Sequence, residues 1–146
     1  MTLRVGAVTL AFLHPDSLLL DASEAANDYS AVFRLSYGTF SALFLGDVST
    51  AVEDALVARH GRELDVDLLK VAHHGSGTST GAALLSQTTP ALALVPVGRR
   101  NRYRHPNPQV ISRLEAAGVR VLRTDLDGSI TVKITARGRI AARTGQ

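Results

Sequence analysis

The sequence predicts a layered α/β domain, and three observations lead to that prediction. Short apolar runs typical of buried strands alternate with segments that carry helix-start and helix-end signals. Three of the apolar runs end in polar residues that could do chemistry: Asp47, the pair His73-His74, and the stretch 98–106. The 146 residues contain no internal repeat, low-complexity segment or linker. We therefore expect one domain spanning residues 1–146, with its functional residues along one edge of a sheet.

The first part of the chain predicts strands joined by turns. Leu3–Leu13 is typical of one bent strand or two short strands, and the polar, alanine-rich segment Asp16–Asn27 is typical of a loop. Ser30–Tyr37 and Phe40–Leu45 are apolar and aromatic segments on either side of Gly38-Thr39. A two-residue turn that contains glycine between two such segments indicates a β-hairpin.

Asp47 follows a glycine at the end of this predicted hairpin. A carboxylate in that position either caps the next helix or stands at the rim of a site. Thr50 and Glu53 have the spacing of a capping box for a helix that runs to about His60. We therefore expect that box to cap the helix, which leaves Asp47 available for other contacts.

Two adjacent histidines, His73 and His74, follow the apolar strand predicted at Val66–Val71. The glycine after the pair lets the backbone turn sharply, and a buried strand before it holds the rings in place. On an extended backbone the two rings would point to opposite faces, so only one would readily join a given metal site. The alternative is that one histidine ends the strand and the other is solvated.

A small, hydroxyl-rich loop, residues 76–81, precedes a helix predicted at Ala82–Gln87. Backbone amides at the start of a helix can bind phosphate. The candidate phosphate contacts in this loop are therefore Ser76, Thr78 and Ser79. An ordinary flexible connection is the alternative.

The stretch 98–106 follows a strand predicted at Ala91–Val97 and contains four arginines, a tyrosine and a histidine. Guanidinium groups bind phosphate oxygens and an aromatic ring can stack on a base, which favours a nucleic-acid contact over a solvated basic loop. The candidate substrate contacts are Arg100, Asn101, Arg102, Tyr103 and His105. Asn107-Pro108 then carries the start signals of a helix that ends at Gly118.

The C-terminal part of the chain predicts strands and a turn. Val119–Arg123 is typical of a strand, Thr124–Gly128 of a turn, and Ser129–Thr135 of a second strand. Arg139–Ala142 has a weaker strand pattern. We expect these segments to form a terminal hairpin or meander.

The composition limits the kinds of site and partner. The chain has no cysteine, so any metal ligands would be His, Asp or Glu side chains. Sixteen basic residues against thirteen acidic ones give a net charge of +3, which is compatible with a polyanionic partner such as DNA. The apolar run Val5–Leu13 is too short to span a bilayer and Met1 opens no signal sequence, so we expect no transmembrane segment in these residues.

Five short segments form a series that runs through nearly the whole chain: Asn27–Ser30, Leu45–Asp47, Leu69–Ser76, Asn101–Pro106 and Arg123–Gly128. This series resembles the metallo-β-lactamase-like domain of ComEC-type DNA-internalisation competence proteins. The resemblance implies the C-terminal half of an αββα sandwich, in which a mixed sheet is flanked by helices.

The same resemblance implies hydrolysis of phosphodiester bonds at two divalent metal ions, commonly zinc or manganese. It implies that the catalytic residues are Asp47, His73 and His74: Asp47 matches the bridging aspartate and one histidine matches the last histidine ligand. We favour His74 as the ligand and His73 as a substrate contact. A carboxylate shared by two cations about 3.5–4 Å apart can hold a hydroxide for in-line attack on phosphorus. Single-stranded DNA would be the partner, beside a membrane channel on the extracytoplasmic side.

The chain departs from this family in its histidines. Such domains carry a His-x-His-x-Asp-His cluster in their first half, whereas the histidines here are His14, His60, His73, His74 and His105. Two or three ligands are too few for the two-metal site, because a catalytic zinc ion uses three protein ligands and each metal of a pair needs its own set. We therefore expect a partial domain that is inactive alone and exposes one sheet face, which would favour pairing with the missing half or with a second copy.

Three functions are compatible with these observations. The chain could be part of a metal-dependent nuclease for DNA uptake, completed by the missing half of the domain. It could instead be a DNA-binding or interaction module that has lost the metal. The third function is that of a related phosphodiesterase acting on a small molecule or a wall polymer.

Overall fold

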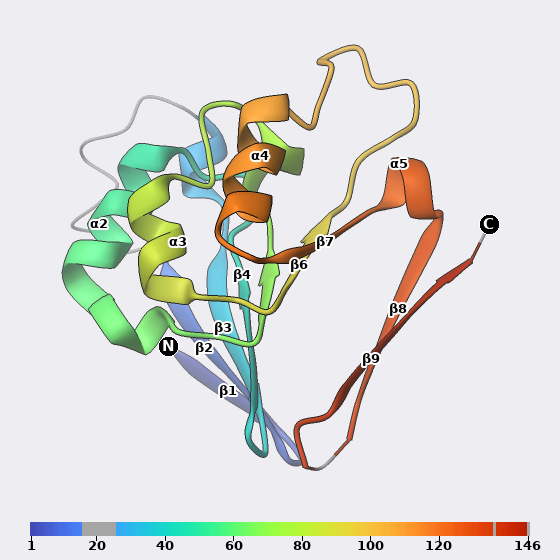
Figure 1. Cartoon of the computed structure of the whole chain (residues 1–146). Helices are drawn as coiled ribbons and strands as arrows, with labels where there is room; N and C mark the ends of the chain where they lie inside the picture. The colour runs from blue at the N-terminus through green and yellow to red at the C-terminus, as the bar shows by residue number, and fades with distance from the viewer. Residues whose placement is uncertain (16–25, 136, 146) are drawn as a thin grey trace.

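The computed structural model describes residues 1–15, 26–135 and 137–145, and the centre of this part of the chain is a seven-stranded sheet (Figure 1). The strands lie in the order β1 (Thr2–Val5), β2 (Val8–His14), β3 (Val32–Tyr37), β4 (Phe40–Phe44), β5 (Leu68–Lys70), β6 (Leu92–Val95) and β7 (Arg120–Arg123). Neighbours from β1 to β4 are antiparallel, whereas β4 to β7 run parallel. The predicted mixed sheet is confirmed, and Leu3–Leu13 contributes to two strands.

Helices make the connections between the parallel strands. The segments concerned are α2 (Thr50–His60) and the 3-10 helix η2 (Gly61–Leu64) between β4 and β5, η3 (Ala72–Gly75) and α3 (Ala82–Thr88) between β5 and β6, and α4 (Pro108–Ala116) between β6 and β7. Parallel strands require such crossovers, and Figure 1 shows α2, α3 and α4 together on one side of the sheet. Asn107 caps α4 as predicted, because its Oδ1 accepts a hydrogen bond from the Gln109 amide at 2.9 Å.

The remaining elements lie before β3 and after β7. The 3-10 helix η1 (Ala26–Tyr29) leads into β3, and most of the predicted loop Asp16–Asn27, residues 16–25, lies outside the described residues. A helical turn, α5 (Thr124–Asp127), takes the place of the predicted turn. β8 (Ser129–Ile134) and β9 (Ile140–Gly145) then form the predicted terminal hairpin.

The sheet face toward the helices is a closed apolar core. Leu43 of β4, Leu69 of β5 and Ala93 of β6 have no exposed surface, and they belong to one cluster with Leu56 of α2 and Leu114 of α4. Burial of one such leucine contributes about 1.5–3 kcal/mol to folding. This side of the sheet is therefore complete within the described residues.

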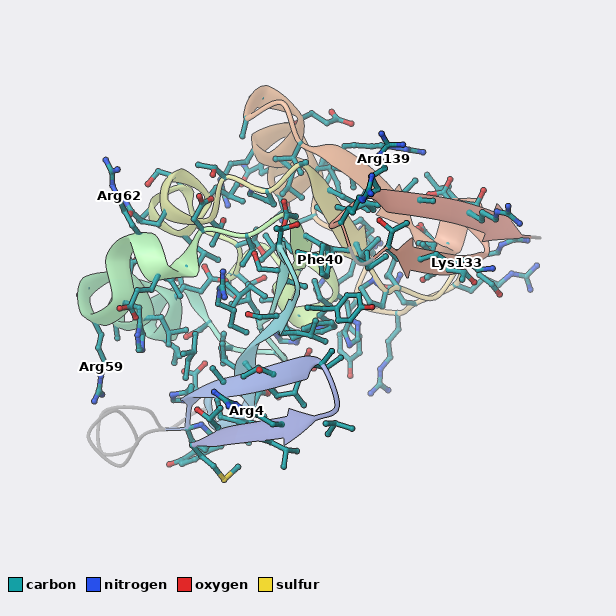
Figure 2. The ribbon with its side chains drawn as sticks, turned by 90° about the horizontal axis from the view of Figure 1, so that it is seen from below. Arg4, Phe40, Arg59, Arg62, Lys133 and Arg139 are labelled. Atoms are coloured by element: carbon teal, nitrogen blue, oxygen red, sulfur yellow. The ribbon has the colours of Figure 1, made fainter. Side chains whose placement is uncertain are left out.

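The opposite face is covered only in part. The β8–β9 hairpin packs Ile130 and Val132 into a cluster with Phe40 and Leu68. Figure 2 shows the β1–β2 hairpin well apart from β8 and β9. Strand pairing puts Val5 on the same face as Phe40, and Val5 is 63% exposed. Exposed apolar residues of this face are therefore found on β1, whereas the chain's own hairpin covers Phe40 and Leu68.

The predicted capping box of α2 is wrong. Ser49, not Thr50, is the N-cap residue, and it makes no side-chain cap hydrogen bond. Glu53 does not reach back to the helix start, because its two carboxylate oxygens accept the backbone N–H groups of Thr80 and Gly81 at 2.6 and 2.7 Å. Buried N–H groups need a partner, and Glu53 is the acceptor within reach of these two. Asp47 still has no capping role.

Candidate functional site

The residues that directly follow β4, β5 and β6 lie together at one edge of the sheet, because these three strands run parallel. The backbone joins these segments directly: the amide of His73 donates to the carbonyl of Gly46 at 3.1 Å, and the amide of Asn107 donates to the carbonyl of Gly75 at 2.8 Å. The structure therefore brings together Asp47, the histidine pair and the basic loop, as the sequence predicted.

Asp47 faces His74 across this edge, with Oδ2 and Nε2 3.7 Å apart. The other ring nitrogen of His74, Nδ1, lies 2.7 Å from the carbonyl oxygen of Pro96. A carbonyl only accepts, so Nδ1 carries the hydrogen and Nε2 of the neutral ring presents a lone pair to the carboxylate. Metal-binding histidines commonly have this arrangement, with a backbone carbonyl fixing the tautomer.

Lys70 approaches the other oxygen of Asp47. Its Nζ lies 3.7 Å from Oδ1 of Asp47 and donates to the carbonyl of Gly46 at 2.8 Å. Burial lowers the pKa of Lys70, while the neighbouring carboxylate opposes that shift. The sequence interpretation gave Lys70 no role, although a lysine at the end of an otherwise apolar strand was a usable signal.

The histidine pair does not continue the strand in an extended conformation, so that prediction is wrong. His73 and His74 have φ values of 46° and 54°, in the left-handed region that non-glycine residues rarely adopt. The turn is closed by a hydrogen bond from the Ser76 amide to the His73 carbonyl at 2.9 Å. The ring centroids lie 6.3 Å apart, so both rings stay at the same edge of the sheet.

Gly75 brings the basic loop against the histidine pair. Its φ is +80°, and a Cβ at this position would lie 2.5 Å from Cβ of Pro106. That distance is too short for any real contact, so the loop could not pack here against a larger residue.

Asn101 holds the basic loop, residues 98–106, in a fixed shape. Its Nδ2 donates to the carbonyls of Gly98 and His105 at 3.0 and 2.8 Å, and its Oδ1 accepts the amide of His105 at 2.7 Å. Arg99 extends from the same loop to the carbonyl of Asp125 at 3.1 Å. The loop is therefore built before any ligand binds, and Asn101 uses its side chain inside it.

A row of four rings crosses the site from the basic loop to Asp47. We call this the ring row: Tyr103, His105, His73 and His74. Successive ring centroids lie 5.8, 5.6 and 6.3 Å apart, and the Tyr103 and His105 planes differ by 19°. Burial lowers the pKa of His105, and the neighbouring histidines lower it further.

The loop 76–81 is held mostly by its own contacts. Ser79 is fully buried and its hydroxyl donates to the carbonyls of Ala72 and Ser76, both at 3.0 Å. The Thr80 and Gly81 amides, which precede α3, already bind Glu53. Among the three candidate residues, Thr78 is exposed. Its hydroxyl lies 3.0 Å from the Ser76 hydroxyl.

The side chains at this edge of the sheet offer few donors for a metal ion. Within the described ranges, no group of three or more His, Cys, Asp or Glu side chains could hold a metal ion. His14 bonds to the Asp28 carbonyl and His60 pairs with Glu63, so neither joins the site. Asp47 and His74 nevertheless fit as two ligands of one ion, since zinc binds histidine nitrogen and carboxylate oxygen at about 2.0–2.2 Å.

In the part of the chain that the structure describes, no helix has the length and apolarity needed to cross a membrane.

The chain is similar in sequence to several bacterial proteins, of which three are described here. The chain is 36% identical over 117 residues to the competence protein ComA of Neisseria gonorrhoeae, which covers 80% of the chain and 17% of the relative. It is 38% identical over 104 residues to ComE operon protein 3 of Bacillus subtilis, and this match covers 71% of the chain and 13% of the relative. It is 34% identical over 110 residues to Recombination protein 2 of Haemophilus influenzae, and this match covers 75% of the chain and 14% of the relative.

The chain thus spans less than one fifth of the length of these curated relatives. No protein-family model matches it.

Proposed function

We propose, from the relationship of this chain to a family of competence-related proteins, that it is part of a metal-dependent phosphodiesterase domain that acts on DNA during uptake. In this proposal the chain is the C-terminal half of a metallo-β-lactamase-like domain of the ComEC type. A sheet with helices on one face and an uncovered region on the other supports a half sandwich.

The observation that carries this proposal is the pairing of Asp47 with His74. A carboxylate oxygen and an imidazole lone pair face each other at 3.7 Å, and both are acceptors when the ring is neutral. Two acceptors in this position repel each other unless a cation or a proton lies between them. The Pro96 carbonyl fixes the ring in that orientation, which supports a role for His74 as a ligand.

A divalent cation at these ligands would activate water and neutralise charge on a phosphodiester. The chain's own groups would orient the substrate. His73 lies beside the basic loop, where Arg100 and Arg102 would bind phosphate oxygens. Lys70, next to Asp47, would keep that carboxylate in place.

The other ligands would come from polypeptide outside this chain, either the missing half of the sandwich or a second copy. The chain's share of 13–17% of its relatives' length supports that source. A membrane channel in the same parent protein is a further proposed partner.

A DNA-binding module without metal is the second candidate function. It is favoured by the absence of a three-ligand group among the described residues and by Lys70, whose ammonium group already lies near the Asp47 carboxylate. In that case the basic loop would bind DNA, and Asp47 would be structural.

Nuclease activity on single-stranded DNA with added manganese or zinc separates the two functions. We expect no cleavage by the chain alone and cleavage when a polypeptide carrying the His-x-His-x-Asp-His half is added. Asp47→Asn and His74→Ala should abolish cleavage and metal binding in the mixture, because each removes a ligand. Salt-sensitive DNA binding without cleavage in the mixture would support the module instead. Cleavage that survives Asp47→Asn would contradict the role of Asp47 as a ligand.

A further inference from the structure

Tyr103 is a large aromatic side chain on the surface of the basic loop, with 65% of its surface exposed. Most exposed tyrosines need no explanation, but this one contacts two other side chains of the basic loop. The Arg102 guanidinium carbon lies 4.9 Å from the Tyr103 ring centroid, and Nη2 of Arg102 donates to the Tyr103 hydroxyl at 2.6 Å. His105 lies nearly parallel to it at 5.8 Å.

The surroundings of Tyr103 are also fixed before a ligand arrives. Asn101 closes the loop through three hydrogen bonds, and Pro106 packs against Gly75. Tyrosine has only two side-chain torsions, so little conformational entropy remains to be lost on binding. A fixed, exposed ring in a basic loop has the features of a stacking platform for unpaired bases.

The ring row leads from this platform to the proposed reaction site. The His73 ring lies 5.6 Å from His105, and His74 reaches to 3.7 Å from Asp47. Base-paired nucleotides could not present their faces to such a row, whereas the bases of a single strand can stack on aromatic groups with little dependence on sequence.

We infer that Tyr103 and His105 form a nucleobase-stacking subsite, which holds an unpaired base of a single strand next to the phosphodiester at Asp47 and His74. This inference rests on the proposed function for the kind of substrate. It adds that the faces of the bases, and not only the phosphates, contribute to binding.

The test compares two fluorescent oligonucleotides of equal length and charge: a mixed-sequence single strand and an abasic strand. Their binding to the 146-residue chain is measured by fluorescence anisotropy at low salt, because phosphate contacts are strongest there. We expect tighter binding of the single strand than of the abasic strand.

Tyr103→Ala should weaken binding of the single strand about 5- to 150-fold, the range for one lost base stack, and leave the abasic strand unaffected. Tyr103→Phe should restore single-strand binding, because the ring and not the hydroxyl stacks. Arg100→Ala is the matched control, and it should weaken both strands alike through a lost phosphate contact. A 2-aminopurine base in the strand should be quenched on binding to the natural chain and not to Tyr103→Ala.

Equal losses for the single and abasic strands in Tyr103→Ala, or no loss in either, would overturn the stacking subsite. If Arg100→Ala nevertheless weakens the binding of both strands, the DNA-binding part of the proposed function holds without the stacking subsite. If no oligonucleotide binds at low salt, both proposals are wrong for this chain.

Discussion

The two faces of the seven-stranded sheet differ in how far this chain completes them. On the helix side, residues such as Leu43 and Leu69 have no exposed surface, and α2, α3 and α4 close the core. On the other side, the β8–β9 hairpin covers Phe40 and Leu68, while Val5 of β1 is 63% exposed. One face therefore makes the chain stable, whereas the other keeps exposed apolar surface at β1.

The position of the candidate site follows from the complete face. The site lies at the ends of the parallel strands β4, β5 and β6. The helices that connect these parallel strands form the helix layer. Asp47, His74 and the basic loop are thus held by the stable part of the molecule, whereas the exposed apolar residues Leu3 and Val5 lie on β1. An arrangement of this kind can keep its site geometry while a partner binds elsewhere.

The largest expected effect comes from removing apolar volume on the complete face. Leu69→Ala should lower the free energy of unfolding by about 2–5 kcal/mol, because it leaves a cavity in a closed core. Leu10→Ala, on the partly covered face, should cost about 1 kcal/mol or less, since Leu10 is only half-buried. Urea unfolding of both variants measures the difference, and equal losses would contradict the comparison.

A smaller, pH-dependent effect is expected from Glu53, which is almost fully buried in the helix layer. Burial raises the pKa of Glu53 from 4.5 to about 7, although two backbone N–H bonds oppose the shift. The folded chain therefore binds the proton more tightly than the unfolded chain. The stability from this group is complete below pH 4.5 and is lost as the pH rises to about 7, by up to about 1.4 kcal/mol per pH unit.

Urea unfolding between pH 4.5 and 8 should show this slope, and Glu53→Gln should remove it. The difference between the two proteins is the informative quantity, because the lowered pKa of His105 gives a slope of the opposite sign in both. Identical pH profiles for the two proteins would show that Glu53 does not titrate in this range.

The smallest effect on stability, and the most specific one, is expected at the edge of the open face. Val5→Lys should change the free energy of unfolding by less than about 0.5 kcal/mol, since Val5 is largely exposed. It should reduce concentration-dependent self-association in sedimentation experiments, because a charge would enter the apolar face. Thr2→Lys adds the same charge to the other face of β1, and an equal reduction there would show that net charge alone is responsible.

Most of the fold was predictable because strand and helix patterns are local. The hairpin around Gly38-Thr39, the strand at Val66–Val71 and the Asn107 cap follow from residues close together in the chain. The capping box failed for the opposite reason. Glu53 meets the amides of Thr80 and Gly81, a contact between residues 27 and 28 positions apart that no local pattern contains.

The sequence predicted which residues follow the strands and form the site, but it did not predict the geometry of the site. The sequence indicated that Asp47 and the histidine pair would lie along one edge of a sheet, because each follows a predicted strand. It did not indicate the left-handed backbone of the histidine pair or the approach of Lys70 to Asp47. Both depend on how the turn at η3 packs against Gly46, which is a tertiary contact.

The contact between Gly75 and Pro106 has a consequence for how this site could change during evolution. Gly75 ends η3 and Pro106 ends the basic loop, and a Cβ added at Gly75 would lie only 2.5 Å from Cβ of Pro106. A substitution at either position would shift the basic loop relative to the histidines, so we expect the two positions to vary together or not at all. The spacing between the basic loop and His74 is then set by two residues that belong neither to the ring row nor to the Asp47–His74 pair.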